Sequence, residues 1–306
     1  MLSSTGFSMA YFLQQLASAL PIAALYALLA FGYSISFSVT KRADLTYGAL
    51  FGFAGQIFLL FSDFAWNRLW LVLPVALAVG AIAALVYALG AGFVIGRSVM
   101  RSLATTSANT VVVASLGVAM VLMEVSRIAA ETRSLWLPPF LNTPLTLWPD
   151  PQFPVTLTVI QLLNTALMVA MVVAGHQFLA RSAWGRCWRA VSDDAGAAAL
   201  CGVDGKRVFI AAYGLSAFLA AIAGILATSY YGNMDFGAGL VFGVKVLFIA
   251  AIGGQTAPLL AAAGAAAMGL SETLWSAYGP MLWRDFAIFS FLVLLLVLTR
   301  KEQFQP

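Results

Sequence analysis

"GRCWRAVSDDAGAAALCGVDGKRVF" (residues 185–209) is a charged stretch in the middle of an apolar chain. It holds three arginines, one lysine and three aspartates, and long apolar segments flank it on both sides. Such a cluster of basic residues is typical of a loop at one face of a membrane. The stretch therefore predicts a short polar connection between two membrane-crossing helices.

The composition of the rest of the chain supports a membrane fold. Of 306 residues, 62% are hydrophobic and 9% are charged, and the mean hydropathy is +0.93. Soluble domains are about 45–50% apolar and about 25% charged. The first residues carry no basic region and no clear cleavage site, so we expect a retained transmembrane helix near the N-terminus. The net charge of +4 reflects membrane orientation, and no nucleic-acid partner is expected.

Nine apolar segments predict an all-α, polytopic membrane helix bundle, a single domain over residues 1–306 with eight to ten transmembrane or re-entrant helices. A bilayer core requires about 20 apolar residues of helix. Two segments, Gly48–Phe61 and Leu240–Ile252, are shorter and are expected to be half-helices or re-entrant elements. The other seven are Phe12–Phe37, Leu69–Ile95, Asn109–Ile128, Val155–Leu179, Val208–Tyr230, Pro258–Trp275 and Phe286–Leu298.

The basic residues predict the orientation, because short cytoplasmic loops carry an excess of Lys and Arg. If all nine segments cross and the N-terminus is outside, eleven of the sixteen basic residues are cytoplasmic and four are external. The C-terminus is then cytoplasmic. The external loop at about 130–154 holds six of the eleven prolines and is either a stiff connector or a docking surface.

Residues 184–203 are expected to form one short cytoplasmic helix. From Arg186 to Cys201 the residues favour a helix apart from Gly196, and Gly202 supplies a stop. Small alanine side chains along it permit close approach of another surface. The alternative is a basic connecting helix that only satisfies the positive-inside rule.

The same segment resembles the cytoplasmic loop of the permease subunits of ABC importers for branched-chain amino acids. Their loop has the form G-R-x-x-R-A-V-x-x-D-x-x-A-A-x-L-x-G-[IV], which begins here at Gly185. In that family the loop is the coupling helix, which docks into a groove of the ATPase subunit. The resemblance implies that the ATPase-coupling residues are Arg186, Arg189, Asp194, Ala197, Ala198, Leu200 and Gly202.

The resemblance extends to "GVKVLFIAAIGG" (243–254), "AAAGAAAMGLSE" (261–272) and "WRDFAIFSFLVLLLVL" (283–298). It implies a multi-pass protein of the bacterial cytoplasmic (inner) membrane that works with ABC ATPase subunits, a second identical or homologous permease subunit and an external solute-binding protein. ATP and Mg belong to the partner ATPase, and no cofactor is expected on this chain, which has no G-x-x-x-x-G-K-[ST] motif. "DLTYG" (44–48) resembles the related sugar-type permeases, so urea, short amides, aromatic acids or sugars stay open as cargo beside amino acids.

Ionisable residues inside apolar segments are candidates for function. Lys245 either lies on the translocation path or reaches toward the interface, and Glu272 is expected near the outer end of its span. Glu124 and Arg127 are three residues apart, which predicts an ion pair on one helix face.

Polar residues in the spans give further candidates for the path. The hydroxyls of Ser34 and Ser38 share a helix face and either line the path or bond to the preceding turn. Asn109 and Ser115 lie at the start of the fourth segment, where Asn109 is alternatively a helix cap.

The remaining function classes have weaker support. Cys187 and Cys201 are separated by roughly 21 Å along a helix, which is too far for a disulfide. With His176 as the only histidine and no Cys-x-x-Cys pair, the sequence indicates no metal site. The chain is not expected to be an enzyme, since it has no nucleophile–base pair. A self-contained secondary transporter or channel stays open as the alternative, although few central acidic residues are available for ion coupling.

Overall fold

Each of the nine apolar segments forms a helix in the computed structural model, which describes residues 9–103, 107–149, 154–253 and 256–299. Residues 1–8, Arg300 and Lys301, and residues 150–153 of the proline-rich loop lie outside the described residues. The nine helices are α1 (Met9–Thr40), α2 (Thr46–Asn67), α3 (Leu73–Val94), α4 (Ala108–Ala129), α5 (Val159–Arg181), α8 (Gly205–Tyr231), α9 (Ala238–Gly253), α10 (Pro258–Tyr278) and α11 (Arg284–Thr299).

Six of these helices are long and apolar enough to cross a membrane: α1, α2, α3, α4, α5 and α8. The expectation that the second segment is too short was wrong, because α2 extends beyond its apolar centre at both ends and has 22 residues. The short segment near residue 240 is confirmed as the 16-residue α9. The predicted polytopic helix bundle is therefore the observed fold.

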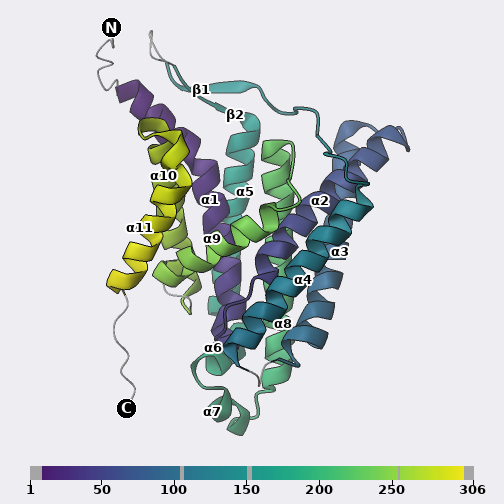
Figure 1. Cartoon of the computed structure of the whole chain (residues 1–306), viewed down its shortest axis with the longest axis vertical. Helices are drawn as coiled ribbons and strands as arrows, with labels where there is room; N and C mark the ends of the chain where they lie inside the picture. Colours follow the sequence, from purple (N-terminus) through teal and green to yellow (C-terminus); the bar gives the residue numbers. More distant parts are fainter. Residues whose placement is uncertain (1–8, 104–106, 150–153, 254–255, 300–306) are drawn as a thin grey trace.

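Helix α1 lies at the centre of the bundle and packs against α10, α8 and α5. Helix α2 packs against α3, α4, α8 and α9 on the other side. Helix α9 runs obliquely between these two groups (Figure 1). It contacts α1, α2, α10 and α11, so this short helix is covered mainly by protein, which is how a bilayer accommodates a non-spanning segment.

Glycines bring α2 and α9 into direct backbone contact. Gly48 and Gly52 on α2 face Gly239 and Gly243 on α9. A Cβ placed on Gly52 would lie 2.7 Å from the Gly239 Cα, and one on Gly48 would overlap the Gly243 Cα. Small residues at four-residue spacing allow such close helix crossings in membranes.

A two-stranded antiparallel hairpin marks one end of the molecule. It pairs β1 (Pro144–Trp148) with β2 (Val155–Thr158), so the residues expected to begin the fifth span are a strand. Helix α5 begins only after Thr158, whose hydroxyl accepts from the Gln161 N–H while the Gln161 side chain accepts from Thr158 N–H. The Gln14 side chain of α1 binds the Thr156 backbone through both its amide oxygen and its amide nitrogen.

Helices α6 (Ala183–Asp193) and α7 (Ala195–Leu200) lie at the opposite end, which we call the α7 end (Figure 1). A π-helical turn, η1 (Ile95–Met100), extends α3 toward this end. A 3-10 turn, η2 (Met281–Trp283), joins α10 to α11. The charged stretch of the sequence therefore forms a cap on one end of an otherwise apolar bundle.

Candidate functional site

The charged segment forms two helices, which corrects the expectation of one continuous helix over residues 184–203. Asp194 interrupts it with an extended backbone (φ −147°, ψ 106°). The Asp194 carboxylate then accepts from the backbone N–H groups of Gly196 (2.7 Å) and Ala197 (3.0 Å) and so caps α7. A residue that favours helix N-termini therefore ends α6 and begins α7.

Helix α6 is anchored to the membrane helices by two side chains. The Trp188 indole nitrogen donates to the backbone oxygen of Ile35 in α1 (3.1 Å). The Arg189 guanidinium donates to the Leu179 backbone oxygen at the end of α5 (2.7 Å). Arg189 thus binds carbonyls that the end of a helix leaves unpaired, while Arg186 is exposed.

Helix α7 presents a small apolar surface outside the bundle. Leu200 is 92% exposed, and Ala197 beside it is exposed. Ala198 points inward and is buried, so it is not on this surface. The expected stop is confirmed at Gly202, whose φ of +82° lies in the left-handed region that favours glycine.

Helix α8 starts three residues after Gly202. The Asp204 carboxylate caps it by accepting from the N–H groups of Lys206 (3.0 Å) and Arg207 (3.3 Å). The Val203 N–H donates back to the Ala198 carbonyl (3.0 Å), which fixes the connection. Helices α7 and α8 are therefore joined by a short, hydrogen-bonded link.

The serines proposed for the path make hydrogen bonds to the preceding helical turn and to neighbouring segments. The Ser38 hydroxyl donates to the Ser34 backbone oxygen (2.7 Å) and also to that of Thr256 (3.2 Å). The Ser115 hydroxyl donates to the Val112 backbone oxygen (2.8 Å) and accepts from the Leu45 N–H (3.2 Å). Ser34, Ser38 and Ser115 are all fully buried.

Asn109 lies apart from these serines in the first turn of α4, where it is exposed. It does not cap the helix, because Ser107 occupies that position and accepts from the Thr110 N–H. The structure thus places Ser34 and Ser38 one turn apart on α1, whereas Ser115 and the exposed Asn109 lie on α4.

Lys245 forms a buried ion pair that the sequence did not predict. Its Nζ lies 3.0 Å from the Glu272 carboxylate and 3.7 Å from that of Asp285, and Lys245 and Glu272 are each 7% exposed. The Tyr26 hydroxyl donates to the second Glu272 oxygen (2.7 Å). The expectations that Lys245 reaches toward the interface and that Glu272 is interfacial are therefore replaced by an ion pair inside the bundle.

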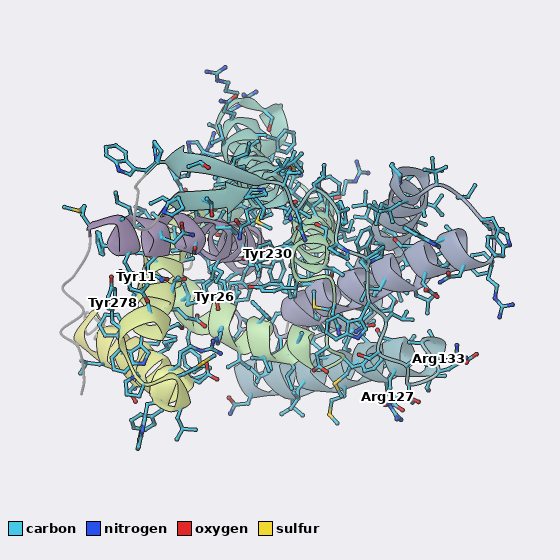
Figure 2. The ribbon with its side chains drawn as sticks, turned by 90° about the horizontal axis from the view of Figure 1, so that it is seen from above. Tyr11, Tyr26, Arg127, Arg133, Tyr230 and Tyr278 are labelled. Carbon is cyan, nitrogen blue, oxygen red and sulfur yellow. The ribbon has the colours of Figure 1, made fainter. Side chains whose placement is uncertain are left out.

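Figure 2 shows how the labelled side chains are distributed. Tyr11 and Tyr278 stack edge to face with their rings 5.7 Å apart, and Tyr26 lies between this pair and the interior. Arg127 lies on the far side of the molecule from these tyrosines. Its Nε donates to Glu124 Oε2 (2.9 Å), which confirms the predicted ion pair. That pair is exposed, in contrast to the buried pair at Lys245.

The segment "DLTYG" (44–48) contains a second buried polar group, which the sequence did not predict. Asp44 accepts hydrogen bonds from the Thr46 N–H (2.8 Å) and the Thr46 hydroxyl (2.6 Å). The Thr46 hydroxyl also contacts the hydroxyl of Tyr213 on α8. Burial raises the pKa of the Asp44 carboxyl, and the hydrogen bonds from Thr46 and Tyr213 partly oppose this rise.

The chain matches a family model along almost its full length. The model, branched-chain amino acid transport system / permease component, covers residues 15–298. No solved structure shows a significant match to the chain.

Curated relatives agree with this family. The high-affinity branched-chain amino acid transport system permease protein LivH of Escherichia coli K12 is 25% identical over 94% of this chain and 93% of LivH. The corresponding protein BraD of Pseudomonas aeruginosa is 23% identical over 94% of each chain. The fructose import permease protein FrcC of Rhizobium meliloti is 35% identical, but over 30% of this chain and 25% of FrcC. With a helical membrane bundle and a family match over nearly all of it, this chain belongs to the branched-chain amino acid transport permease family of ABC transporters.

Proposed function

We propose that this chain is the membrane-spanning subunit of an ATP-driven importer for branched-chain or other small amino acids. Membership of the permease family and the names of LivH and BraD support this proposal. In it, a separate cytoplasmic ATPase binds ATP and Mg and hydrolyses the nucleotide, so this chain is not itself an enzyme. A second permease subunit and an external solute-binding protein complete the importer in the bacterial inner membrane.

The exposed surface of α7 carries the coupling part of the proposal. Leu200 is 92% exposed and lies four residues before Asp204, in the most charged part of the described chain. An apolar side chain there faces water instead of lipid, and covering it with a partner surface is favourable by about 2 kcal/mol. The small side chains of Ala195, Ala197 and Ala199 let that partner approach closely.

Helix α8 supplies a route from this surface to the membrane helices. Its residue Tyr213 contacts Thr46 at the start of α2, and the Ser216 hydroxyl donates to the Gly32 backbone oxygen in α1 (2.9 Å). When the ATPase closes on α7, α8 moves against α1 and α2. In the proposed mechanism this movement opens the path alternately to the two sides of the membrane.

A matched pair of leucine substitutions tests the coupling. Leu200→Ser is expected to reduce ATP-driven leucine uptake by about tenfold in proteoliposomes, because it removes the apolar contact with the ATPase. Leu282→Ser is the control, since Leu282 in η2 is also 92% exposed but lies away from α7. Equal uptake by both variants would contradict the docking role of α7. Arg189→Glu is a less specific test, because Arg189 also binds the end of α5.

A secondary transporter would need no ATPase. The same proteoliposomes, prepared with and without the ATPase and the solute-binding protein, separate the two mechanisms. Uptake is expected only when ATP and all components are present. Uptake by this chain alone, driven by a proton or sodium gradient, would overturn the importer proposal.

A further inference from the structure

A cavity of about 330 Å³ lies between the end of α5, helix α6 and the start of α10. Its walls combine polar residues with apolar ones, among them His176, Arg189, Ser192, Asp193, Leu259 and Leu260. This volume is within the range of small-molecule sites in proteins, about 300–1,000 Å³. The cavity is therefore large enough for a ligand and has polar groups that could orient it.

One part of the cavity is suited to an anion. Helix α10 begins there, and Ala257 at its N-cap position makes no side-chain cap hydrogen bond. The first N–H groups of a helix have no partner within it and attract negative charge. Ser192 supplies a further donor, because it is 6% exposed and its hydroxyl makes no hydrogen bond within the part of the chain that the structure describes. A buried hydroxyl without a partner is unfavourable, so a ligand that accepts from it is favoured.

Asp193 gives the same cavity a negative charge. It lies four residues after Arg189 on α6, a spacing that places both side chains on one helix face. They form no ion pair, and Arg189 donates instead to the Leu179 backbone oxygen (2.7 Å). Over the described residues, Asp193 has neither a basic partner nor a hydrogen bond from a side chain. A ligand with both an anionic and a cationic group therefore matches this cavity.

The cavity also opens toward the surface that faces lipid. An exposed stripe of the membrane-crossing helix α5 leads into it and consists of Val169, Val173, His176 and Ala180. Leu260 of α10 is 63% exposed beside it. Phe178 and Trp184 stack next to the cavity with their rings 5.7 Å apart, and aromatic residues of this kind are frequent where a bilayer meets water. These features place the cavity at the level of lipid headgroups.

We infer that this cavity binds the headgroup of a zwitterionic phospholipid with a primary amine, as in phosphatidylethanolamine, from the leaflet at the α7 end. The lipid phosphate accepts from the Ser192 hydroxyl and from the N–H groups at the start of α10, next to the positive charge of Arg189. The lipid ammonium binds Asp193, and the acyl chains lie along the exposed stripe of α5. This inference is independent of the cargo and the ATPase in the proposed function.

The pair of charges favours this lipid over the alternatives. An anionic headgroup such as phosphatidylglycerol would leave Asp193 without a cation and add a negative charge near it. Phosphatidylcholine carries a cation, but its quaternary nitrogen has no N–H to donate to the carboxylate. A soluble zwitterion lacks the acyl chains that hold a headgroup at the membrane surface and so raise its local concentration at the cavity.

Lipid retention tests the site. The full chain is placed in nanodiscs that contain equal amounts of phosphatidylethanolamine, phosphatidylglycerol and phosphatidylcholine with identical acyl chains. It is then released into mild detergent, and native mass spectrometry identifies the lipid that stays bound. Phosphatidylethanolamine is expected to be retained about tenfold over each of the other two, because its ammonium makes a charge-assisted hydrogen bond.

Substitutions on α6 then assign the two ends of the headgroup. Asp193→Asn is expected to lower retention of phosphatidylethanolamine about tenfold and to remove its preference over the other lipids. Ser192→Ala is expected to lower retention of all three lipids, and Ser192→Thr, which keeps the hydroxyl, should restore it. The matched controls are Arg186→Gln, an exposed arginine of α6 outside the cavity, and Asp63→Asn in α2, and both should leave retention unchanged.

Several outcomes would overturn the inference. Equal retention of the three lipids would reject a specific headgroup site, as would a preference that survives both Asp193→Asn and Ser192→Ala. Displacement of the lipid by soluble O-phosphoethanolamine would assign the cavity to a soluble ligand. If a variant does not fold, the unmodified chain decides: phosphatidylethanolamine with a photoreactive diazirine beside its glycerol group is expected to crosslink within residues 176–193 or 256–263, and crosslinks confined to other helices would reject the site.

Discussion

Lys245 is the residue whose environment differs most from its sequence context. It lies in the apolar run "GVKVLFIAA", yet its ammonium group contacts Glu272 from α10 and Asp285 from α11. The charges of Lys245 and Glu272 are compensated inside the protein, which makes a lysine at this depth tolerable. The ion pair joins α9 to α10, the helix that packs most closely along α1.

Breaking this pair is expected to be more destabilising than replacing it. Lys245→Met leaves Glu272 buried without its counter-charge and should lower the free energy of unfolding by about 3–5 kcal/mol. The double variant Lys245→Met/Glu272→Gln removes both charges and keeps an oxygen for the Tyr26 hydroxyl, so it should recover most of that loss. SDS titration of the purified chain, followed by circular dichroism, measures both. A double variant no more stable than the single one would contradict this account.

Side-chain contacts within one helix follow from the sequence, whereas contacts between helices do not. Glu124 and Arg127 were paired correctly because their contact is local, three residues apart on one helix. Lys245 and Glu272 are 27 residues apart and Thr46 and Tyr213 are 167 apart, so their contacts depend on how the helices pack. Nothing in the local sequence specifies that packing.

At the scale of elements, the nine helices followed directly from the apolar segments, because the bilayer requires each spanning backbone to satisfy its own hydrogen bonds. The β1–β2 hairpin and the break at Asp194 did not follow. The hairpin forms next to prolines from which a stiff connector or a docking surface was expected, and a single capping aspartate ended α6 within a run of residues that favour helix. Such boundaries depend on one or two hydrogen bonds.

The glycine contact between α2 and α9 gives a prediction at this scale. Gly48→Ala would place a methyl group against the Gly243 backbone, and separating the helices is expected to cost about 1–3 kcal/mol. Gly90→Ala in α3 is the matched control, because the added methyl group would meet nothing within 4 Å beyond its chain neighbours and its own helix backbone, and it should be neutral or slightly stabilising. Thermal denaturation in detergent distinguishes the two. Similar melting temperatures for both variants would show that the α2–α9 contact is not tight.

At the scale of the whole molecule, the orientation in the membrane stays a prediction from the distribution of basic residues. The hairpin and α7 lie at opposite ends of the bundle (Figure 1), so an orientation with the hairpin outside places α7 in the cytoplasm. The orientation can be tested by cysteine labelling, because Cys201 at the α7 end is a free, exposed cysteine next to Leu200.

In cells that produce this chain without its ATPase, a membrane-impermeant maleimide should therefore label Cys201 only after the cells are permeabilised. The control is Leu145→Cys in a Cys201→Ser background, because Leu145 lies on the exposed strand β1 and should be labelled in intact cells. Labelling of Cys201 from outside, with protection of position 145, would reverse the predicted orientation. Mass spectrometry of the labelled peptides identifies which cysteine has reacted.

Helix α1 is held at both of its ends by elements that face water. Gln14 is bound to the hairpin, and the Ile35 carbonyl is bound to Trp188 of α6. These two points are 21 residues apart, or about 32 Å along an α-helix, which is close to the thickness of the hydrocarbon core. If the solute-binding protein of the proposed importer docks on the hairpin, α1 is then a direct mechanical connection between it and α6 across the thickness of the bilayer.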